Sequence, residues 1–345
     1  MKKIKRSVKI VIAVALVIVL LLASGVIFYL SKLNLIKFSN GKFTWNGSID
    51  ASDSETLDEE SRMNEAIADL EERDAIDATG EIYKDKRFLN ILLIGTDERT
   101  ENFSENARGD SCMIMSIGKK DGSLKLASLE RGMGVPILEG KYKGQYDWLT
   151  HTFRYGGADL MMREVRECFK VDVERYIRVN FATFKKGIDS VGGIDITLTA
   201  AEAGYINSKI NKKNAYSAGL NHLDGNAALA YARCRHIDSD WHRIERQRNV
   251  IQAVVTKTKD LNVGELNTLL NNVLPLVQTN LTRLEITELL LSAPKYRGVQ
   301  IKQMTVPISG SYGGMRGLGG RSLFSVDFDT NAKALREFIY GVTAE

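Results

Sequence analysis

Apolar and polar positions divide the chain into an apolar N-terminus, an acidic segment and a long region of mixed pattern. Residues 10–30 carry no charged side chain and are almost entirely apolar. Residues 49–80 are rich in Ser, Asp and Glu. From about residue 84, short apolar or alternating runs, which predict strands, take turns with segments of helical periodicity. No linker interrupts this region, so we predict one α/β (αβα-type) domain with a mixed central sheet over residues 84–345.

The individual elements of this domain follow from period and turn signals. The predicted strands are "RFLNILLIG", "SCMIMSIG", "SLKLASL", "YIRVNF", "IDITLT", "IKQMTVPI" and "LFSVDF". The predicted helices are "GADLMMREVRECF", "ATFKKGIDSVGG", "LDGNAALAYAR", "DWHRIERQRNVIQAVVTKTKDL", a segment near 282–293 and "TNAKALREFIYGV". Asp224 and Asp240 stand where the third and fourth helices need caps. The glycine-rich "GSYGGMRGLGGR" is expected to be a flexible surface loop, because it lacks the ending of a phosphate-binding loop.

The apolar segment at residues 10–30 is long enough, at about 1.5 Å per residue, to cross a bilayer. Basic residues precede it and no comparable basic flank follows, which places the N-terminus in the cytoplasm. A cleaved signal peptide is the alternative, but its apolar region is shorter and ends at a small-residue cleavage site. We therefore expect a cytoplasmic tail at 1–9, a single-pass transmembrane helix at 10–30 and an extracellular remainder, as in a Gram-positive-type envelope.

Charge is segregated along the chain, although the formal net charge is only +4. Residues 49–80 are strongly acidic, and the domain that follows is basic, which favours anionic partners. We expect an acidic extracellular stalk or linker over residues 31–83, consisting mainly of a solvated spacer. Thr56 and Glu59 form a capping-box pair ahead of apolar residues at helical spacing, so a short helix is the alternative.

Two aspartates are candidates for a cation site. Asp97 follows a buried strand that stops at Gly95, and Asp110 directly precedes the next strand. If these strands pair as a hairpin, the two carboxylates converge and need either a cation or a shared proton. Oxygen ligands beside phosphate suit Mg²⁺. The alternative is a turn aspartate and a capping aspartate that are unrelated.

Arginines gather at the ends of predicted elements. Arg131 follows a strand in a glycine-flanked turn, and Arg233 and Arg235 leave the end of one helix. Arg243 and Gln247 are four residues apart and share a face near the start of the next helix. Guanidinium groups beside a helix N-terminus suit a phosphate anion. The alternative is that these arginines and the neighbouring acids neutralise one another.

Several motifs occur in one order: "NILLIGTDER", "ARGDS", "LASLERGMGVPI", "VDVERYIRVNFATFKKGIDSVGGIDITL" and "LDGNAALAYARCRHIDSDWHRIERQRNVI". In this order they resemble the LytR–CpsA–Psr family of bacterial cell-wall phosphotransferases over about residues 86–260. The resemblance implies transfer of a phosphosugar glycopolymer (teichoic acid, capsule or another wall polymer) from undecaprenyl pyrophosphate to a peptidoglycan hydroxyl, which forms a phosphodiester. The implied partners are the lipid-linked polymer, peptidoglycan and the membrane, with no nucleic acid.

The resemblance also implies roles for the candidate residues. Asp97 and Asp110 are expected to hold Mg²⁺ against the pyrophosphate. The residues expected to bind pyrophosphate oxygens are Arg108, Arg131, Arg233 and Arg235. The expected catalytic residues are Arg131, Asp240, Arg243 and Gln247, with Asp240 or Asp97 as the base for the acceptor hydroxyl. The family buries the polyprenyl chain in an apolar tunnel whose residues the sequence does not identify.

One turn departs from the family pattern. The family usually has Pro-Arg-Asp-Thr where this chain has Glu130, Arg131, Gly132 and Met133. If the missing aspartate orients the arginine or assists the acceptor, its role is either vacant or taken by Glu130. Two alternatives therefore stay open beside the transferase: a non-catalytic, regulatory protein that binds lipid pyrophosphates, and a pyrophosphatase that uses water as the acceptor.

Overall fold

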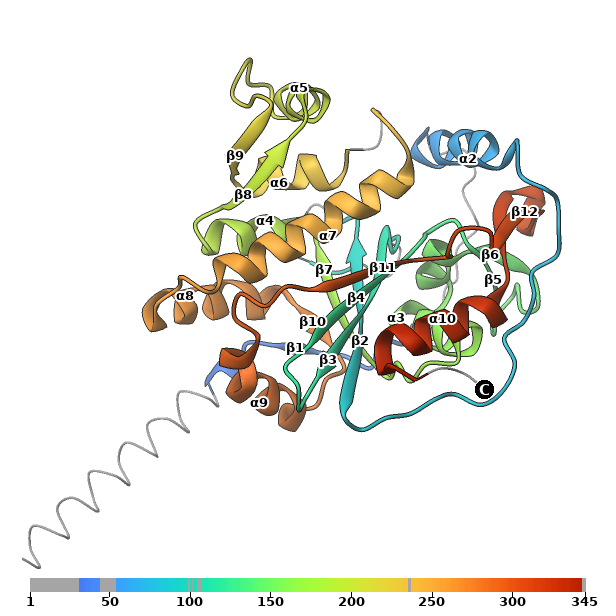
Figure 1. The fold of residues 1–345 in the computed structure, drawn as a ribbon, viewed down its shortest axis with the longest axis horizontal. Helices are drawn as coiled ribbons and strands as arrows, with labels where there is room; N and C mark the ends of the chain where they lie inside the picture. Colours follow the sequence, from blue (N-terminus) through green and yellow to red (C-terminus); the bar gives the residue numbers. More distant parts are fainter. Residues whose placement is uncertain are drawn as a thin grey trace, which may run out of the picture.

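The computed structural model describes residues 31–43, 54–98, 100, 102–104, 107–234 and 237–342 (Figure 1). Within them, seven strands form a central mixed sheet in the order β1-β10-β7-β2-β3-β4-β11. These strands are β1 (Lys37–Phe38), β2 (Phe88–Thr96), β3 (Ser111–Gly118), β4 (Leu124–Leu129), β7 (Arg175–Asn180), β10 (Gln278–Thr279) and β11 (Lys302–Val306). β2, β3 and β4 form an antiparallel meander, whereas β7 pairs with β2 and β11 with β4 in parallel. The predicted α/β fold with a mixed central sheet is confirmed.

Helices cover both faces of this sheet. Side chains alternate between the faces along each strand, so Leu92 and Ile94 of β2 enter one core cluster while Ile91 enters another. The covering helices are α3 (Leu149–Phe169), α7 (Asp240–Lys257), α9 (Arg283–Ser292) and α10 (Phe328–Tyr340). α3 and α10 pack on the first face, and α7 and α9 pack on the second (Figure 1). The predicted strand alternation thus produces a helix–sheet–helix sandwich.

A second, smaller core lies beside β7. Its elements are α4 (Phe181–Ser190), β8 (Ile194–Leu198), α5 (Ala200–Lys209), β9 (Gly219–Leu223), α6 (Gly225–Ala232) and α8 (Val263–Val273). Ile194, Ile206 and Leu223 are fully buried in it. The predicted strand "IDITLT" forms as β8, but it pairs with β9 outside the central sheet. Asp224 caps α6 as predicted, because its side chain accepts from the backbone N–H of Ala227.

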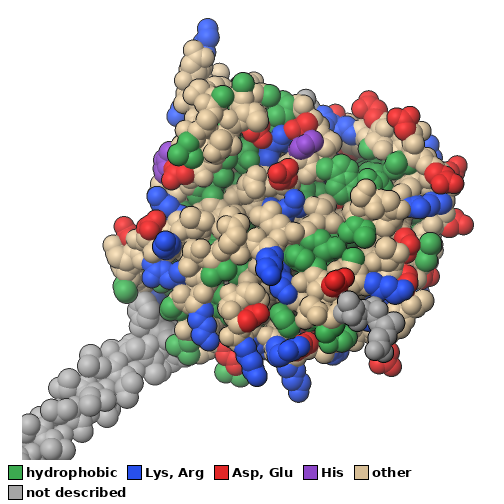
Figure 2. Space-filling view, in the orientation of Figure 1, with side chains coloured by type: hydrophobic (Ala, Val, Ile, Leu, Met, Phe, Trp, Pro, Cys, Tyr) green, Lys and Arg blue, Asp and Glu red, His purple; other side chains and the backbone are tan. Residues whose placement is uncertain are grey.

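The acidic segment contributes a helix to the domain. α2 spans Ser54–Ile67, and its Met63 and Ile67 are buried in the main core cluster. Farther along, Glu72 and Ile76 make bridges to the strand region near the C-terminus. Figure 2 shows acidic side chains gathered over α2, at the upper right of the molecule. The solvated spacer predicted for residues 49–80 is therefore wrong where the structure describes it, because apolar residues at helical spacing pack the helix against the domain.

The glycine-rich segment is also more ordered than predicted. Tyr312–Arg316 form β12, which pairs antiparallel with β13 (Ser322–Val326). A Cβ atom on Gly313 would lie 2.6 Å from the carbonyl oxygen of Glu71, so a glycine is needed for this close backbone approach. The prediction of a flexible surface loop is wrong for this hairpin. A further hairpin joins β5 (Gly134–Pro136) to β6 (Tyr146–Trp148), and short 3₁₀ turns lie at Leu274–Leu276, Ala293–Tyr296 and Leu318–Gly320.

Among the described residues, no helix has the length and apolar character needed to cross a membrane. The predicted tail at 1–9 and transmembrane helix at 10–30 lie outside the described residues. They remain predictions.

Two glycines test this packing. Gly157 interrupts α3 with a φ of +72°, and a Cβ there would lie 2.2 Å from the carbonyl oxygen of Gly41. Gly157→Ala should therefore lower the free energy of unfolding by about 2 kcal/mol or more. Gly204 is an exposed residue of α5 with open space around it, so Gly204→Ala should raise the free energy of unfolding by about 0.5–1 kcal/mol. Urea denaturation of the full chain measures both, and equal midpoints for the two variants would contradict the described packing.

Candidate active site

The β2–β3 hairpin brings the two candidate aspartates to one end of the sheet. Gly95 pairs with Ser111 in the antiparallel register, so the chain leaves β2 toward Asp97 close to where Asp110 enters β3. Arg108 fixes Asp97, because its backbone N–H donates to Oδ1 at 3.1 Å and its Nε donates to Oδ2 at 3.3 Å. The predicted hairpin is confirmed.

Asp110 lacks a full set of partners. Its Oδ1 atom is buried and accepts no hydrogen bond within the described structure. Burial first, and then the charges of Glu59 and Asp97, raise the pKa of Asp110 to about 6. A buried carboxylate oxygen without a partner is costly. This carboxyl group is therefore placed to take up either a proton or a cation.

Asp240 joins two of the candidate arginines. Its Oδ2 atom accepts from Nε of Arg131 at 2.9 Å and lies 3.4 Å from Nη2 of Arg243. Both guanidinium groups are buried. Asp240 was predicted to cap α7, but Ser239 holds the N-cap position and Asp240 is the first residue of the helix. The capping prediction is wrong, and the carboxylate pairs with the arginines instead.

The sequence interpretation missed one residue of this cluster, Glu59 of α2. Its side chain is only 1% exposed, and its Oε1 atom accepts from Nη1 of Arg131 at 2.6 Å. Its Oε2 atom lies 3.9 Å from Nη1 of Arg108. A signal was present in the sequence, since Glu59 is four residues before Met63 and thus on the apolar face of the helix. A carboxylate on an apolar helix face indicates a buried cationic partner.

Glu130 does not take the role of an arginine partner. Its Oε2 atom accepts from the backbone N–H of Gly132 in the same turn. Between the described residues Glu130 and Arg131, no hydrogen bond or ion pair forms within 4 Å. Burial, followed by the charge of Asp240, raises the pKa of Glu130 to about 7. Glu130 thus stabilises its own turn and is partly protonated at neutral pH.

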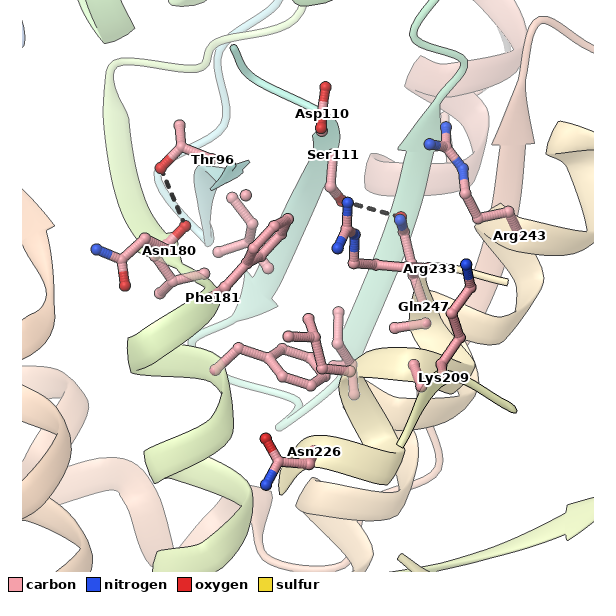
Figure 3. A pocket seen from close by; sticks show the side chains of 18 of the residues that line it. Thr96, Asp110, Ser111, Asn180, Phe181, Lys209, Asn226, Arg233, Arg243 and Gln247 are labelled. Carbon is pink, nitrogen blue, oxygen red and sulfur yellow. Dashed lines mark hydrogen bonds between the residues drawn. The ribbon is translucent and has the colours of Figure 1, made fainter. Parts of the chain in front are cut away.

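A cavity of about 890 Å³ opens beside this cluster (Figure 3). Its apolar walls come from β2, β3 and β7 and from α4, α6 and α7, and they include Leu93, Met113, Ile177, Val179, Phe184, Leu229 and Ile251. Figure 3 shows Asp110, Ser111, Arg243 and Gln247 in its upper part, which we call the polar end of the cavity. Ser111 Oγ donates to Gln247 Oε1 at 3.0 Å. Further polar side chains, those of Thr96, Asn180, Lys209 and Asn226, line the cavity elsewhere, so its walls are mainly apolar with polar groups at this end and at scattered positions.

Arg233 also lines this cavity. It stands at the C-cap of α6, and its guanidinium lies 4.4 Å from the centre of the Phe181 ring. Arg235 lies outside the described residues. The chain just after Arg233 is held by Arg246, which donates to Glu202 at 2.7 Å and to the carbonyl oxygen of Cys234 at 2.9 Å. Arg246 therefore helps to fix the chain next to Arg233 without lining the cavity itself.

The described candidates fall into two adjoining groups. Asp110, Arg233, Arg243 and Gln247 line the cavity. Asp97, Arg108, Arg131 and Asp240 are bound to one another or to Glu59 beside it. The groups are joined where Arg243 approaches Asp240. The arrangement offers guanidinium groups, a titratable carboxyl group and an enclosed apolar space, which together suit an amphipathic anion.

Relatives by sequence are cell-wall transferases. One is the polyisoprenyl-teichoic acid–peptidoglycan teichoic acid transferase TagU of Bacillus cereus, which is 32% identical over 201 residues. That match covers 56% of this chain and 61% of the relative. A TagU of Enterococcus faecalis is 33% identical over 181 residues, with 51% of this chain and 56% of the relative covered. The chain thus matches somewhat more than half the length of these relatives.

Solved structures share the fold. TagT bound to LIIa-WTA superposes with a TM-score of 0.60 at 25% identity, over 77% of this chain and 97% of that chain. Protein gbs0355 from Streptococcus agalactiae gives a TM-score of 0.63 at 23% identity, over 75% of this chain and 90% of that chain. TagT (YwtF) with bound octaprenyl pyrophosphate lipid gives 0.56 at 22% identity, over 77% and 97% of the two chains.

The sequence profile of the LytR_cpsA_psr family matches residues 50–336, a range that includes α2, every strand of the central sheet except β1, and the cavity. Because this match covers most of the chain, the protein belongs to the LytR_cpsA_psr family.

Proposed function

We propose that this protein transfers a phosphosugar glycopolymer, of the teichoic acid or capsule type, from a polyprenyl pyrophosphate to a peptidoglycan hydroxyl. The observation that carries the proposal is the cavity, whose walls are mainly apolar and whose lining includes the guanidinium groups of Arg233 and Arg243. A polyprenyl pyrophosphate has the same division, with a long hydrocarbon chain and a compact anionic group. Its chain gains free energy by leaving water for the apolar walls, and its phosphates meet guanidinium groups.

Two observations on related proteins support the choice of ligand. The TagU relatives are named for transfer of teichoic acid to peptidoglycan. A structure with the same fold holds octaprenyl pyrophosphate lipid, and another holds LIIa-WTA. We further propose that residues 10–30 anchor the chain in the cell membrane with the catalytic domain outside, which would confine it to the surface that carries its donor.

In the proposed reaction, the acceptor hydroxyl oxygen attacks the phosphorus that carries the polymer. A new P–O bond forms, the bond to the bridging oxygen of the pyrophosphate breaks, and the lipid leaves as a monophosphate. Arg131 and Arg243 are placed to offset the charge that grows on the leaving phosphate. We assign the hydroxyl proton to Asp240, because we assign the other candidate base, Asp97, to the cofactor.

We also propose Mg²⁺ as the cofactor, and the residues fit it. Asp97 and Asp110 supply hard oxygen ligands, and Asp110 Oδ1 is buried without a hydrogen-bond partner. The described residues contain no group of three or more His, Cys, Asp or Glu side chains arranged to hold a metal. The remaining ligands would be water and phosphate oxygens, as is common for Mg²⁺. Bound there, the ion would neutralise phosphate charge and polarise the phosphorus.

One assay tests the function. The full chain, purified in detergent, is incubated with Mg²⁺ and a lipid-pyrophosphate oligosaccharide, with and without peptidoglycan oligomers, and the products are analysed by mass spectrometry. We expect a glycan–phosphate–peptidoglycan adduct that forms only when the oligomers are present. Free sugar phosphate without an adduct would identify a pyrophosphatase. Intact donor, retained on the protein, would identify a non-catalytic binder.

Arg233 and Arg243 test the polar end of the cavity. Each is expected to make charge-assisted hydrogen bonds to the pyrophosphate, which are worth about 1.5–3 kcal/mol. Arg233→Ala and Arg243→Ala should therefore each raise the Kd for the lipid-linked donor by about 10–100-fold in a titration of the full chain. Arg87→Ala is the control, because Arg87 is an exposed residue paired with Asp85. A folded Arg233 or Arg243 variant that binds the donor as well as the control does would refute the assignment.

Asp110 predicts a pH dependence of stability in the absence of Mg²⁺. Because the pKa of Asp110 is raised to about 6, folding favours its protonated form, and this contribution is lost as pH rises from about 4 to 6. The loss is at most about 3 kcal/mol. Asp110→Asn should thus be more stable than the parent at pH 8 and nearly equal to it at pH 4, as measured by urea denaturation. Added Mg²⁺ should reduce the difference in the free energy of unfolding between Asp110→Asn and the parent at pH 8. A difference of the same size at both pH values would contradict a buried carboxyl group that titrates in this range.

A further inference from the structure

We propose that Glu59 of α2 is a positioning residue that holds the guanidinium group of Arg131 in place for the reaction. Its carboxylate supplies the second anchor that the turn after β4 lacks, since Gly132 has no side chain. The inference rests on the proposed transferase function and adds to it a segment that precedes the whole sheet in sequence.

The contacts define the role. Arg131 donates from Nε to Asp240 at 2.9 Å and from Nη1 to Glu59 at 2.6 Å. Two anchors on different nitrogens fix both the position and the rotation of a planar guanidinium. The side chains of Glu59 and Arg131 are 1% and 6% exposed, so water cannot replace either partner. A buried carboxylate of this kind is tolerated only when it is paired.

The location of Glu59 indicates whether it positions Arg131 or competes with the phosphates of the donor for the arginines. Arg243 and Asp110 line the cavity, whereas Glu59 and its partner Arg131 lie outside the lining, and Arg131 is joined to Arg243 through Asp240. Glu59 also approaches Arg108, the residue that binds Asp97. It therefore contacts the site from the side of α2 and leaves the polar end of the cavity open. A carboxylate in the cavity lining would compete with a phosphate for the arginines, whereas Glu59, which lies outside the lining, can orient Arg131 without doing so.

The same helix fills the space over Gly132. A Cβ atom at residue 132 would lie 2.0 Å from Cε of Met63, so Met63 occupies the volume that a side chain there would need. Met63 follows Glu59 by one helical turn. α2 is fixed in turn by Glu60, which accepts from Nε of Arg321 at 2.9 Å. The carboxylate of Glu59 and the Met63 side chain over Gly132 thus come from one docked helix, which packs on β13 and lies near β12 at the upper right of Figure 1.

The test compares Glu59→Gln, Glu59→Asp and Glu60→Gln in the full chain, with the transfer assay under steady-state conditions. Glu59→Gln should lower kcat by about 10–100-fold and change the KM for the lipid-linked donor by less than about threefold, because the arginine is misplaced while the cavity is intact. Glu59→Asp keeps the charge and should recover part of kcat. Glu60→Gln removes a neighbouring anchor of the same helix and should retain the parent kcat.

A variant with a carboxylate at a second position distinguishes the loss of a partner for Arg131 from a general loss of structure. In Glu59→Gln/Met63→Ala/Gly132→Asp, the space over residue 132 is emptied and a carboxylate is restored beside Arg131. We expect kcat to rise at least about fivefold over that of Glu59→Gln, since the anchor is again present. A Glu59→Gln variant with unchanged kcat would overturn the proposal. So would one with a higher rate or tighter donor binding, which would identify Glu59 as a competitor of the donor.

A readout that needs no activity keeps this proposal separate from the proposed function. In chain labelled with ¹⁵N-arginine, the Nη1–H signal of Arg131, assigned with Arg131→Lys, should be slow to exchange in the parent and fast in Glu59→Gln, because Nη1 is the nitrogen that donates to Glu59. If the parent transfers no polymer, the proposed function fails while this signal still decides whether Glu59 holds the arginine. Equal exchange in the parent and the variant would overturn the inference, whatever the activity.

Discussion

The site depends on one buried guanidinium, that of Arg131, and on the carboxylates that neutralise it. A buried charge is stable only with a matched and well-placed partner. The partners here come from opposite ends of the domain: Asp240 begins α7, and Glu59 belongs to α2. The strand end that carries Arg131 therefore requires both helices to dock. The order of β2, β3 and β4 in the sheet sets the distance between these elements, so the fold and the charge pairing support each other.

The sheet explains why residues remote in sequence meet at this point. β2 and β3 are antiparallel, so the loop after β2 returns to the start of β3 and carries Asp97, Arg108 and Asp110 with it. β4 runs antiparallel to β3, and therefore ends where β3 begins. α7 crosses the second face and presents Arg243 and Gln247 to the cavity. The direction of each strand thus decides where its polar residue lies. The apolar walls of the cavity are formed by strand residues whose side chains point to the same face of the sheet.

Strand alternation and helical periodicity were sufficient to predict most of the sheet, α6, α7, α9 and α10, and they placed Asp97 and Asp110 on one hairpin. The same patterns offered α2 only as the alternative to a solvated spacer, because the acidic composition of the segment outweighed the apolar stripe that Met63 and Ile67 complete. They failed for β12, where Gly313 is required by contact with a distant backbone that no local rule anticipates. Glu59 was missed for a related reason: its role depends on tertiary docking, and the composition of its segment resembles a solvated linker.

The charge balance of the site indicates that the proposed donor binds together with protons or a cation. Three buried arginines, Arg108, Arg131 and Arg243, face the carboxyl groups of Glu59, Asp97, Asp110 and Asp240. The cluster is therefore close to neutral before any ligand binds, and a pyrophosphate would add uncompensated negative charge. Compensation can come from protons on Asp110 and Glu130, whose pKa values are raised to about 6 and about 7. It can also come from a cation between Asp97 and Asp110. At neutral pH the protons are only partly available, which is a second reason why we propose a divalent cation that enters with the donor.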